Sequence, residues 1–355
     1  MKPKNNVMTN ETSKPLKKNI QKRKVPYFMY PLAGCISLIA IYVIALTAGQ
    51  YSISVADTFH AIFGKPASIA DSVVIWELRI PRTLVAMLVG IALSISGLIY
   101  QSTFQNELVS PDIIGVSSGA SVGVAVGLFV GLPVMLVSAL GFMFGVLAMV
   151  LTILISRIFK NKSPLMLVIA GILVGGLMSS IVSLITAFAN DSTMPSIVFW
   201  LLGSFTRAKM THIWIMLPIL LFACIFLFLI SGKILNNVAL GREEAKSKGI
   251  NYQAWRLIII GVGTVLTAVS VAVAGSIGWV GLAIPHISRL LVGHTAQRTI
   301  PITIAFGGSF MMLADILSRS ISQAEIPVGA IAGILGIVIF LIILVTRKGA
   351  KYDVD

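Results

Sequence analysis

Two arginines, in the sequence Arg79-Ile80-Pro81-Arg82, are the residues of this chain best placed to do chemistry. They stand directly before an apolar run, roughly residues 82–104, that is long enough to cross a bilayer. A guanidinium presents its N–H groups in a planar fork that matches a carboxylate, and the proline between the two arginines fixes the backbone. A rigid arginine pair at a membrane boundary therefore predicts a binding site for acidic groups that lie outside the membrane.

Charged side chains are otherwise rare within the apolar runs. Asp315 is the best candidate for carrying a proton or cation in a transporter driven by an ion gradient. Arg319 follows it by four residues, so an i,i+4 ion pair is the favoured interpretation. His286 has no second histidine or carboxylate at ligand spacing, and we expect no metal site there. The pattern G-x-x-x-x-G-K-[ST] is absent, so the chain hydrolyses no nucleotide through a P-loop of its own.

A polar stretch between two apolar runs, residues 238–249, has the pattern of a short amphipathic helix. Leu240 and Ala245, with Glu244 and Lys248, recur at helical spacing, and Gly249 is a helix-stop residue. Such a helix either rests on lipid head groups or docks into a cytoplasmic partner and transmits its motion. The pattern alone leaves both interpretations open.

The elements that must position these residues are membrane helices. The chain is 57% hydrophobic and only 11% charged, which is typical of a polytopic membrane protein and not of a soluble domain. Backbone groups in hydrocarbon must be satisfied within their own segment, so the spans are helices and the fold class is all-α. We expect ten spans, roughly 30–49, 82–104, 115–130, 133–156, 164–188, 212–231, 254–274, 278–292, 300–318 and 327–346.

The distribution of basic residues predicts the orientation of the spans. Cytoplasmic loops are enriched in Lys and Arg, and ten spans place both termini on the cytoplasmic side. With that orientation most of the 27 Lys and Arg residues are cytoplasmic. The external side then holds only Lys65, Arg79, Arg82, Arg207, Lys209 and Arg319. The net charge of +14 is explained in this way, and we expect no nucleic-acid partner.

Small residues predict how the helices pack. Gly119, Gly123, Gly127 and Gly131 recur every four residues and would form one smooth helix face, favouring close packing within the subunit over lining a path. At an offset of 178, small residues between 90 and 97 fall on small residues between 268 and 275. Because the two segments would run in opposite directions, the match indicates inverted repeats, a common plan of transporters.

The domain organisation expected from these patterns is simple. Residues 1–29 form a basic, disordered cytoplasmic tail, which is solvated or attracted to anionic lipid head groups. Residues 30–347 form one transmembrane domain, and residues 348–355 form a cytoplasmic tail.

Several motifs of the chain resemble the FecCD-type permeases of ATP-binding-cassette importers for iron–siderophores, haem and cobalamin. The resemblance runs from about residue 35 to residue 347. In chain order it is carried by RIPRT at 79–83, NELVSPDIIGVSSGA at 106–120, ALGRE at 239–243 with Gly249, GWVGLAIPHISR at 278–289, LAD at 313–315 and EIPVG at 325–329. One departure is visible, because the family usually has NPLA where this chain has NELV at residues 106–109.

The resemblance implies a type II importer permease of ten helices in a bacterial plasma membrane. Two permease subunits, identical or related, would surround a path lined by the fifth and tenth helices, and a cytoplasmic ATPase dimer and an external substrate-binding lipoprotein would complete the complex. This chain would bind no cofactor and no metal, be no enzyme itself, and leave ATP and Mg²⁺ to the ATPase. The implied lipoprotein-docking residues are Arg79, Arg82 and Arg319. The implied coupling helix for the ATPase contains Ala239, Leu240, Gly241, Arg242, Glu243 and Gly249.

The favoured function is therefore the import of an Fe(III)–siderophore. The same machine carrying cobalamin or haem is the first alternative, since the sequence does not distinguish these cargoes. A secondary transporter that uses Asp315 for its coupled ion is a poorer alternative. A membrane-embedded enzyme is poorer still, because no paired carboxylates, HExxH motif or Ser/His pair supports it.

Overall fold

In a computed structural model the chain is a bundle of helices, and the structure describes residues 27–158, 164–322 and 324–352. No strand occurs in these three ranges, as expected for an all-α membrane protein. The elements are α1 (Met29–Thr47), α2 (Val55–Ile62), α3 (Ile69–Val73), η1 (Val74–Arg79), α4 (Ile80–Phe104), η2 (Pro111–Ile114), α5 (Val116–Phe129), α6 (Val134–Ile158), α7 (Pro164–Phe188), α8 (Thr193–Leu201), α9 (Met210–Ile230), η3 (Ser231–Leu235), α10 (Asn236–Leu240), α11 (Arg242–Ser247), α12 (Tyr252–Ala274), α13 (Val280–Val292), α14 (Ala296–Ser320) and α15 (Val328–Tyr352).

Each of the ten predicted spans has a helix in the structure. Within the described residues, seven helical segments are long and apolar enough to cross a membrane, and α5, α13 and the apolar part of α15 are three shorter ones. The two shortest predicted spans, 115–130 and 278–292, correspond to the short helices α5 and α13. Helix α15 continues to Tyr352, into the predicted tail at 348–355, and the cytoplasmic location of that tail stays a prediction. Of the tail predicted to be disordered, residues 1–29, residues 1–26 lie outside the described part of the chain, and α1 begins at Met29.

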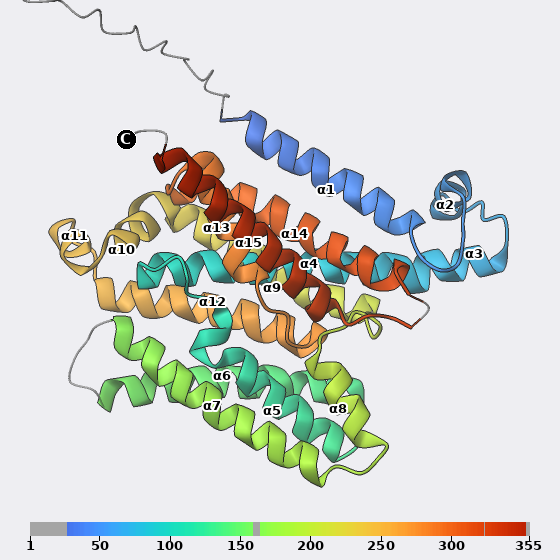
Figure 1. Cartoon of the computed structure of the whole chain (residues 1–355), viewed down its shortest axis with the longest axis horizontal. Helices are drawn as coiled ribbons and strands as arrows, with labels where there is room; N and C mark the ends of the chain where they lie inside the picture. The colour runs from blue at the N-terminus through green and yellow to red at the C-terminus, as the bar shows by residue number, and fades with distance from the viewer. Residues whose placement is uncertain (1–26, 159–163, 323, 353–355) are drawn as a thin grey trace, which may run out of the picture.

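Helix α4 is the centre of the bundle, with α12 and α14 on either side of it (Figure 1). Two glycines let α4 approach its neighbours to backbone contact. A Cβ atom on Gly97 would stand 1.8 Å from the carbonyl oxygen of Gly281 in α13, and one on Gly90 would stand 2.2 Å from that of Gly307 in α14. Small residues at helix crossings are how membrane helices gain contact area, since lipid supplies no hydrophobic driving force between them.

Hydroxyl groups join α4 to α12 inside the bundle. Ser96 Oγ donates to the carbonyl of Gly263 at 2.9 Å and lies 2.6 Å from the hydroxyl of Thr267. One turn further, the hydroxyls of Tyr100 and Thr264 lie 3.1 Å apart. Partner numbers fall along α12 as they rise along α4, so the two helices are antiparallel. Opposite directions are what the ten-span topology predicts for these two helices.

The glycine face of α5 packs against α6. A Cβ on Gly119, Gly123 or Gly127 would lie within 2.4, 2.3 or 3.1 Å, respectively, of an atom of α6. Gly131 does not extend this face as predicted. It follows the end of α5 with φ of +77° and nothing within 4 Å of a Cβ, so it is a turn residue.

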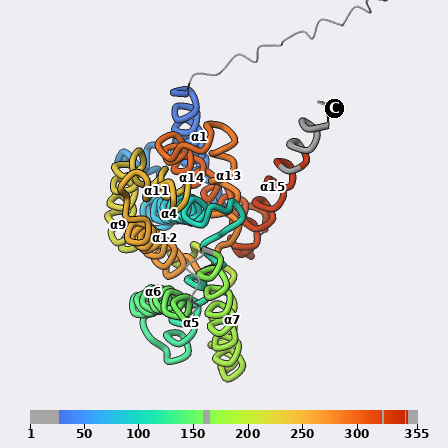
Figure 2. Tube along the Cα trace, turned by 90° about the vertical axis from the view of Figure 1, so that its left-hand side faces the viewer, coloured from blue at the N-terminus to red at the C-terminus, as the bar shows by residue number. Residues whose placement is uncertain are grey.

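The two ends of the bundle carry different short helices, and α7 and α15 lie on one side of it. Helices α2 and α3 lie at one end and α10 and α11 at the opposite end (Figure 1), which we call the α2–α3 end and the α10–α11 end. Figure 2 shows α15, and below it α7, on the side of the molecule opposite α9. Exposed residues of α7 and α15 are mostly large and apolar, as expected for surfaces that meet lipid or another subunit.

Candidate functional sites at the two ends of the bundle

Arg79, the last residue of η1, lies at the α2–α3 end and holds the carboxyl end of α1. Its Nη1 donates to the carbonyls of Leu46 at 2.8 Å and Thr47 at 3.2 Å, and its Nη2 donates to the carbonyl of Tyr51. The last carbonyls of a helix lack partners within the helix and carry partial negative charge, so a guanidinium satisfies and neutralises them. Arg79 is only 4% exposed.

Arg82 and Arg319 share one buried carboxylate. Arg82 Nε lies 2.8 Å from Asp315 Oδ1, and Arg319 Nε lies 3.3 Å from Asp315 Oδ2. Arg82 also reaches Glu325 through Nη1 at 2.7 Å, and Arg319 donates to the carbonyl of Ala45 at 2.6 Å. The expected Asp315–Arg319 pair is therefore present, and Arg82 joins it from another helix.

The structure thus brings together the three arginines predicted for docking. We call Arg79, Arg82, Arg319, Asp315 and Glu325 the arginine cluster. A cavity of about 190 Å³ borders it and is lined by Gly49, Gln50, Tyr51, Val74, Leu78, Arg79, Arg82, Arg319 and Glu325. The three guanidiniums are engaged with groups of this chain, and the cluster has one cation more than it has carboxylates. Buried charge without a matching countercharge is costly, so the cluster favours an additional anion.

The predicted amphipathic helix at 238–249 is two short helices. α10 ends at Leu240 and α11 begins at Arg242, and Gly241 between them has a φ of 108°, a conformation that L side chains rarely adopt. The prediction of one continuous helix is therefore wrong, because the glycine breaks it. Val238 and Ala245 are fully buried while Leu240 is 59% exposed, so the segment 236–247, the α10–α11 segment, presents an apolar side chain outward.

Hydrogen bonds fasten the α10–α11 segment to the bundle. Gln105, just after α4, donates from Nε2 to the carbonyl of Ala239 at 3.1 Å. Asn236 Oδ1 accepts from the amide of Ala296, the first residue of α14, at 2.9 Å. These two hydrogen bonds attach the segment to the end of α4 and to the start of α14.

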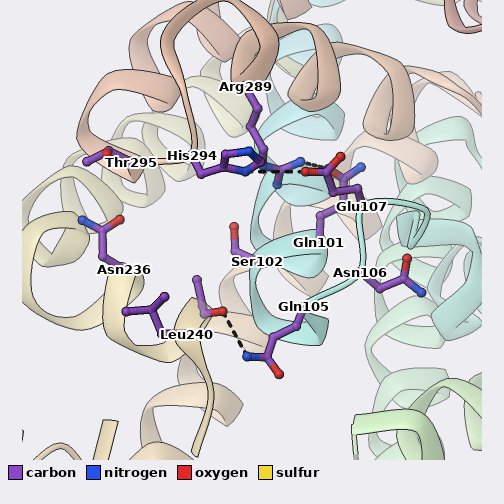
Figure 3. Close-up of a pocket in the computed structure, with 11 residues that line it drawn as sticks. Gln101, Ser102, Gln105, Asn106, Glu107, Asn236, Leu240, Arg289, His294 and Thr295 are labelled. Atoms are coloured by element: carbon purple, nitrogen blue, oxygen red, sulfur yellow. Dashed lines mark hydrogen bonds and ion pairs between the residues drawn. The ribbon is translucent and has the colours of Figure 1, made fainter. Parts of the chain in front are cut away.

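A cavity of about 530 Å³, with mostly polar residues around it, lies between the α10–α11 segment and the ends of α4, α13 and α14 (Figure 3). Its lining residues are Gln101, Ser102, Gln105, Asn106, Glu107, Asn236, Ala239, Leu240, Arg289, His294 and Thr295. Gln101 donates to the carbonyls of Gly281 and Leu282 at 3.2 and 3.3 Å and accepts from Arg289. Glu107 Oε2 lies 2.9 Å from His286 Nδ1, and its Oε1 lies 3.5 Å from His294 Nδ1.

Comparison with known proteins decides the family. Residues 37–346 match the FecCD transport family. The chain belongs to this family. It is 36% identical over 317 residues to the molybdate import system permease protein MolB of Haemophilus influenzae, covering 88% of this chain and 94% of MolB. It is 32% identical to the vitamin B12 import system permease protein BtuC of Shigella boydii, with the same coverage, and 34% identical to a permease described for iron chelatin transport in Helicobacter pylori, covering 78% and 84%.

A solved structure supports the same conclusion for the fold. A transporter described as being of the metal-chelate ABC type, in an inward-facing conformation, matches with a TM-score of 0.82 and 34% identity. The match covers 90% of this chain and all of that one. The chain is therefore a multi-pass, all-helical permease of the ATP-binding-cassette importer type. In this family the ATPase is a separate subunit.

Glu107 is a site residue of this FecCD family permease that sequence reasoning missed. Glu107 stands in the stretch where the family usually has NPLA, and only that departure signalled it. Its partners His286 and His294 are more than 170 residues away in the chain, so no local pattern predicts the contact. No group of three or more His, Cys, Asp or Glu suited to a metal ion occurs within the described ranges.

Proposed function

We propose that this chain is the permease subunit of an importer that moves an Fe(III)–siderophore across a bacterial plasma membrane. Two permease subunits, identical or related, form the path. A cytoplasmic ATPase dimer uses ATP and Mg²⁺ to drive it, and an external lipoprotein delivers the cargo. In this proposal the chain itself is no enzyme and binds no cofactor.

The observation that carries the proposal is the α10–α11 segment. It presents Leu240 outward, and Gln105 and the amide of Ala296 connect it to the ends of α4 and α14. The segment is attached to the bundle and exposes an apolar side chain, which suits docking into a groove of a partner. Burial of such a side chain would stabilise the complex by about 2 kcal/mol. In this proposal the partner is the ATPase, and the α10–α11 end is cytoplasmic, with both termini of the chain on the same side.

The arginine cluster supports delivery of cargo at the α2–α3 end. The cluster contains one more guanidinium than carboxylate, and Arg82 Nη2 has no hydrogen-bond partner among the described residues. A carboxylate of the lipoprotein would supply the missing anion, either by adding to Arg82 or by replacing the part-exposed Glu325. The three arginines would then act as one cationic surface and not as three free side chains.

The position of α7 and α15 supports a second permease subunit. The two helices lie on the same side of the molecule (Figure 2) and correspond to the fifth and tenth spans. In the complex this side would face the second subunit, with the path between them. Membrane lipid would then cover α9, whose exposed side chains include Trp214, Phe222 and Leu229.

Uptake by intact cells tests the proposal. A deletion strain and its complemented parent receive radiolabelled iron as a panel of ferric siderophores, and cobalamin, haem and molybdate in parallel. Loss of the uptake of one siderophore, restored by the gene and sensitive to ATP depletion, is the expected result. Uptake that survives ATP depletion while an ion gradient is maintained would contradict the mechanism and direct attention to Asp315.

The second candidate is the same machine with a different cargo. The names of the relatives include a molybdate permease and a vitamin B12 permease, with identities close to that of the iron-chelatin relative. Loss of molybdate, cobalamin or haem uptake with siderophore uptake unchanged would assign that cargo and leave the rest of the proposal intact.

A further inference from the structure

Glu107 joins three segments at the α10–α11 end. Its own segment is the turn between α4 and η2, which begins at Gln105 with φ of 52°. Its carboxylate contacts His286 of α13 at 2.9 Å and His294 of the α13–α14 connection at 3.5 Å. The His286 side chain is 7% exposed and the His294 side chain is 74% exposed, so the first contact is the better shielded from water.

The turn contacts the α10–α11 segment through Gln105. Gln105, two residues before Glu107, donates to Ala239, and a Cβ on Gly241 would lie 2.7 Å from Gln105 Nε2. In Figure 3, Gln105 and Glu107 border the same cavity, with the α10–α11 segment on the Gln105 side. The turn therefore lies between this segment and α13.

On the Glu107 side, the turn is connected to α15 through His286. The ring of His286 lies against that of Phe340, with centroids 5.5 Å apart and planes at 59°. This aromatic contact connects α13 to the helix that lines the path in the proposed function. Glu107, His286 and Phe340 thus form a continuous chain of contacts from the turn beside the α10–α11 segment to α15.

The groups that face Glu107 leave histidine as its main titratable partner. α13 contributes His286 and Arg289, and the guanidinium of Arg289 is bound to Gln101. The α13–α14 connection contributes His294. In η2, Asp112 accepts a hydrogen bond from Ser117 at 2.6 Å. The facing parts of α4 and α10 contribute the amides of Gln101, Gln105 and Asn236, and α15 contributes the uncharged Phe340.

We propose that Glu107 is a positioning residue that holds the α4–η2 turn against His286, more tightly when His286 is protonated, and so slows ATPase-driven movement at low pH. Imidazole changes its charge between about pH 5 and 8. A protonated imidazole and the carboxylate attract each other as an ion pair, and a neutral imidazole lacks this attraction. The contact is therefore strongest at low pH and weakens as the pH rises. This inference rests on the proposed docking of an ATPase on α10 and α11.

The test is ATP hydrolysis by the full-length chain, reconstituted in liposomes with its ATPase subunit. We compare wild type with E107Q, an isosteric change at a part-exposed side chain, and with E107A as a second variant. The ratio of variant to wild type at each pH cancels the pH dependence of the ATPase itself. We expect a ratio of about 3 near pH 6 and close to 1 near pH 8, the size expected when a partly exposed ion pair is lost.

Two controls separate this role from a merely structural one. Thermal unfolding of each variant at both pH values reports whether the fold is intact, and H294N removes the exposed histidine alone. We expect the ATPase activity of the H294N complex to depend on pH as that of the wild-type complex does. Activity of H294N that does not change with pH relative to its E107Q variant would overturn the assignment to His286. Equal ratios at the two pH values in E107Q and E107A would overturn the proposal. If the wild-type complex hydrolyses no ATP, the proposed function itself fails, a result distinct from an unchanged ratio.

Discussion

Arg82 and Asp315 lie 233 residues apart in the chain, and their side chains meet at 2.8 Å, Nε to Oδ1. The pair ties the start of α4 to the end of α14 at the α2–α3 end. Asp315 is 1% exposed and contacts Arg319 as well, so its charge is offset from two sides. A carboxylate engaged by two guanidiniums has little free capacity to bind a transported cation, which favours an ATP-driven mechanism over a secondary transporter.

Removing one member of this pair is expected to destabilise the protein strongly. Arg82→Gln leaves Asp315 with one guanidinium, and Asp315→Asn leaves two buried guanidiniums short of a carboxylate. We expect each variant to lower the free energy of unfolding by about 3 kcal/mol, because a buried charge loses its partner. The double variant is expected to lose less free energy of unfolding than the two single variants lose together.

Thermal unfolding of the purified chain in detergent checks this prediction. Glu325→Gln is the matched control, because Glu325 is 31% exposed and its contact with Arg82 is partly hydrated. We expect it to cost less than about 1 kcal/mol. Additive costs of the two single changes would show that Arg82 and Asp315 do not stabilise each other.

Arg79 is expected to be irreplaceable even by lysine. Its two terminal nitrogens reach the carbonyls of Leu46, Thr47 and Tyr51 together, and a single ammonium cannot span these positions in the same geometry. Arg79→Lys should lower the free energy of unfolding by about 2 kcal/mol through lost charged hydrogen bonds. Faster amide hydrogen exchange at the end of α1 in this variant would locate the effect. Wild-type exchange there would refute it.

The spans could be predicted from sequence because the bilayer sets their length and composition. The short α5 and α13 were found for the same reason. Contacts between distant residues could not be predicted, since hydropathy says nothing about which charged ends meet. Arg82 with Asp315, and Glu107 with His286, are both of this kind.

Backbone conformation set a second limit. Gly241 lies within a pattern that reads as one amphipathic helix, and only its φ of 108° divides the segment into α10 and α11. Gly131 fits the four-residue glycine repeat equally well but follows the last turn of α5. Glycine favours both close helix packing and helix breaks, so its spacing alone does not distinguish them.

Gly97 is expected to tolerate no side chain. Its ideal Cβ would lie 1.8 Å from the carbonyl oxygen of Gly281, which is backbone and cannot rotate away. Gly97→Ala should therefore force α4 and α13 apart and reduce the yield of folded protein in membranes severalfold, a typical consequence of overpacking that costs about 3 kcal/mol. Monodisperse elution in detergent and the thermal unfolding midpoint are the measurements.

Gly261 of α12 supplies the control for that experiment. A Cβ there would have nothing within 4 Å, so Gly261→Ala should be neutral or stabilising by up to about 1 kcal/mol through helix propensity. Wild-type behaviour of both variants would mean that α4 and α13 do not cross as closely as the structure has them.

Leu240 is expected to carry the contact with the ATPase. It is 59% exposed, whereas Val238 on the same short helix is fully buried, so a change at Leu240 should leave the fold of the permease intact. Leu240→Asp places a charge where an apolar side chain would enter a groove, and we expect the affinity for the ATPase subunit to fall at least about tenfold. Leu240→Met keeps the apolar volume and should bind nearly as wild type.

Co-purification and a binding titration with the ATPase measure both effects, and unfolding midpoints confirm that the variants are folded. Equal affinity of the Asp and Met variants would exclude the α10–α11 segment as the docking surface through this side chain.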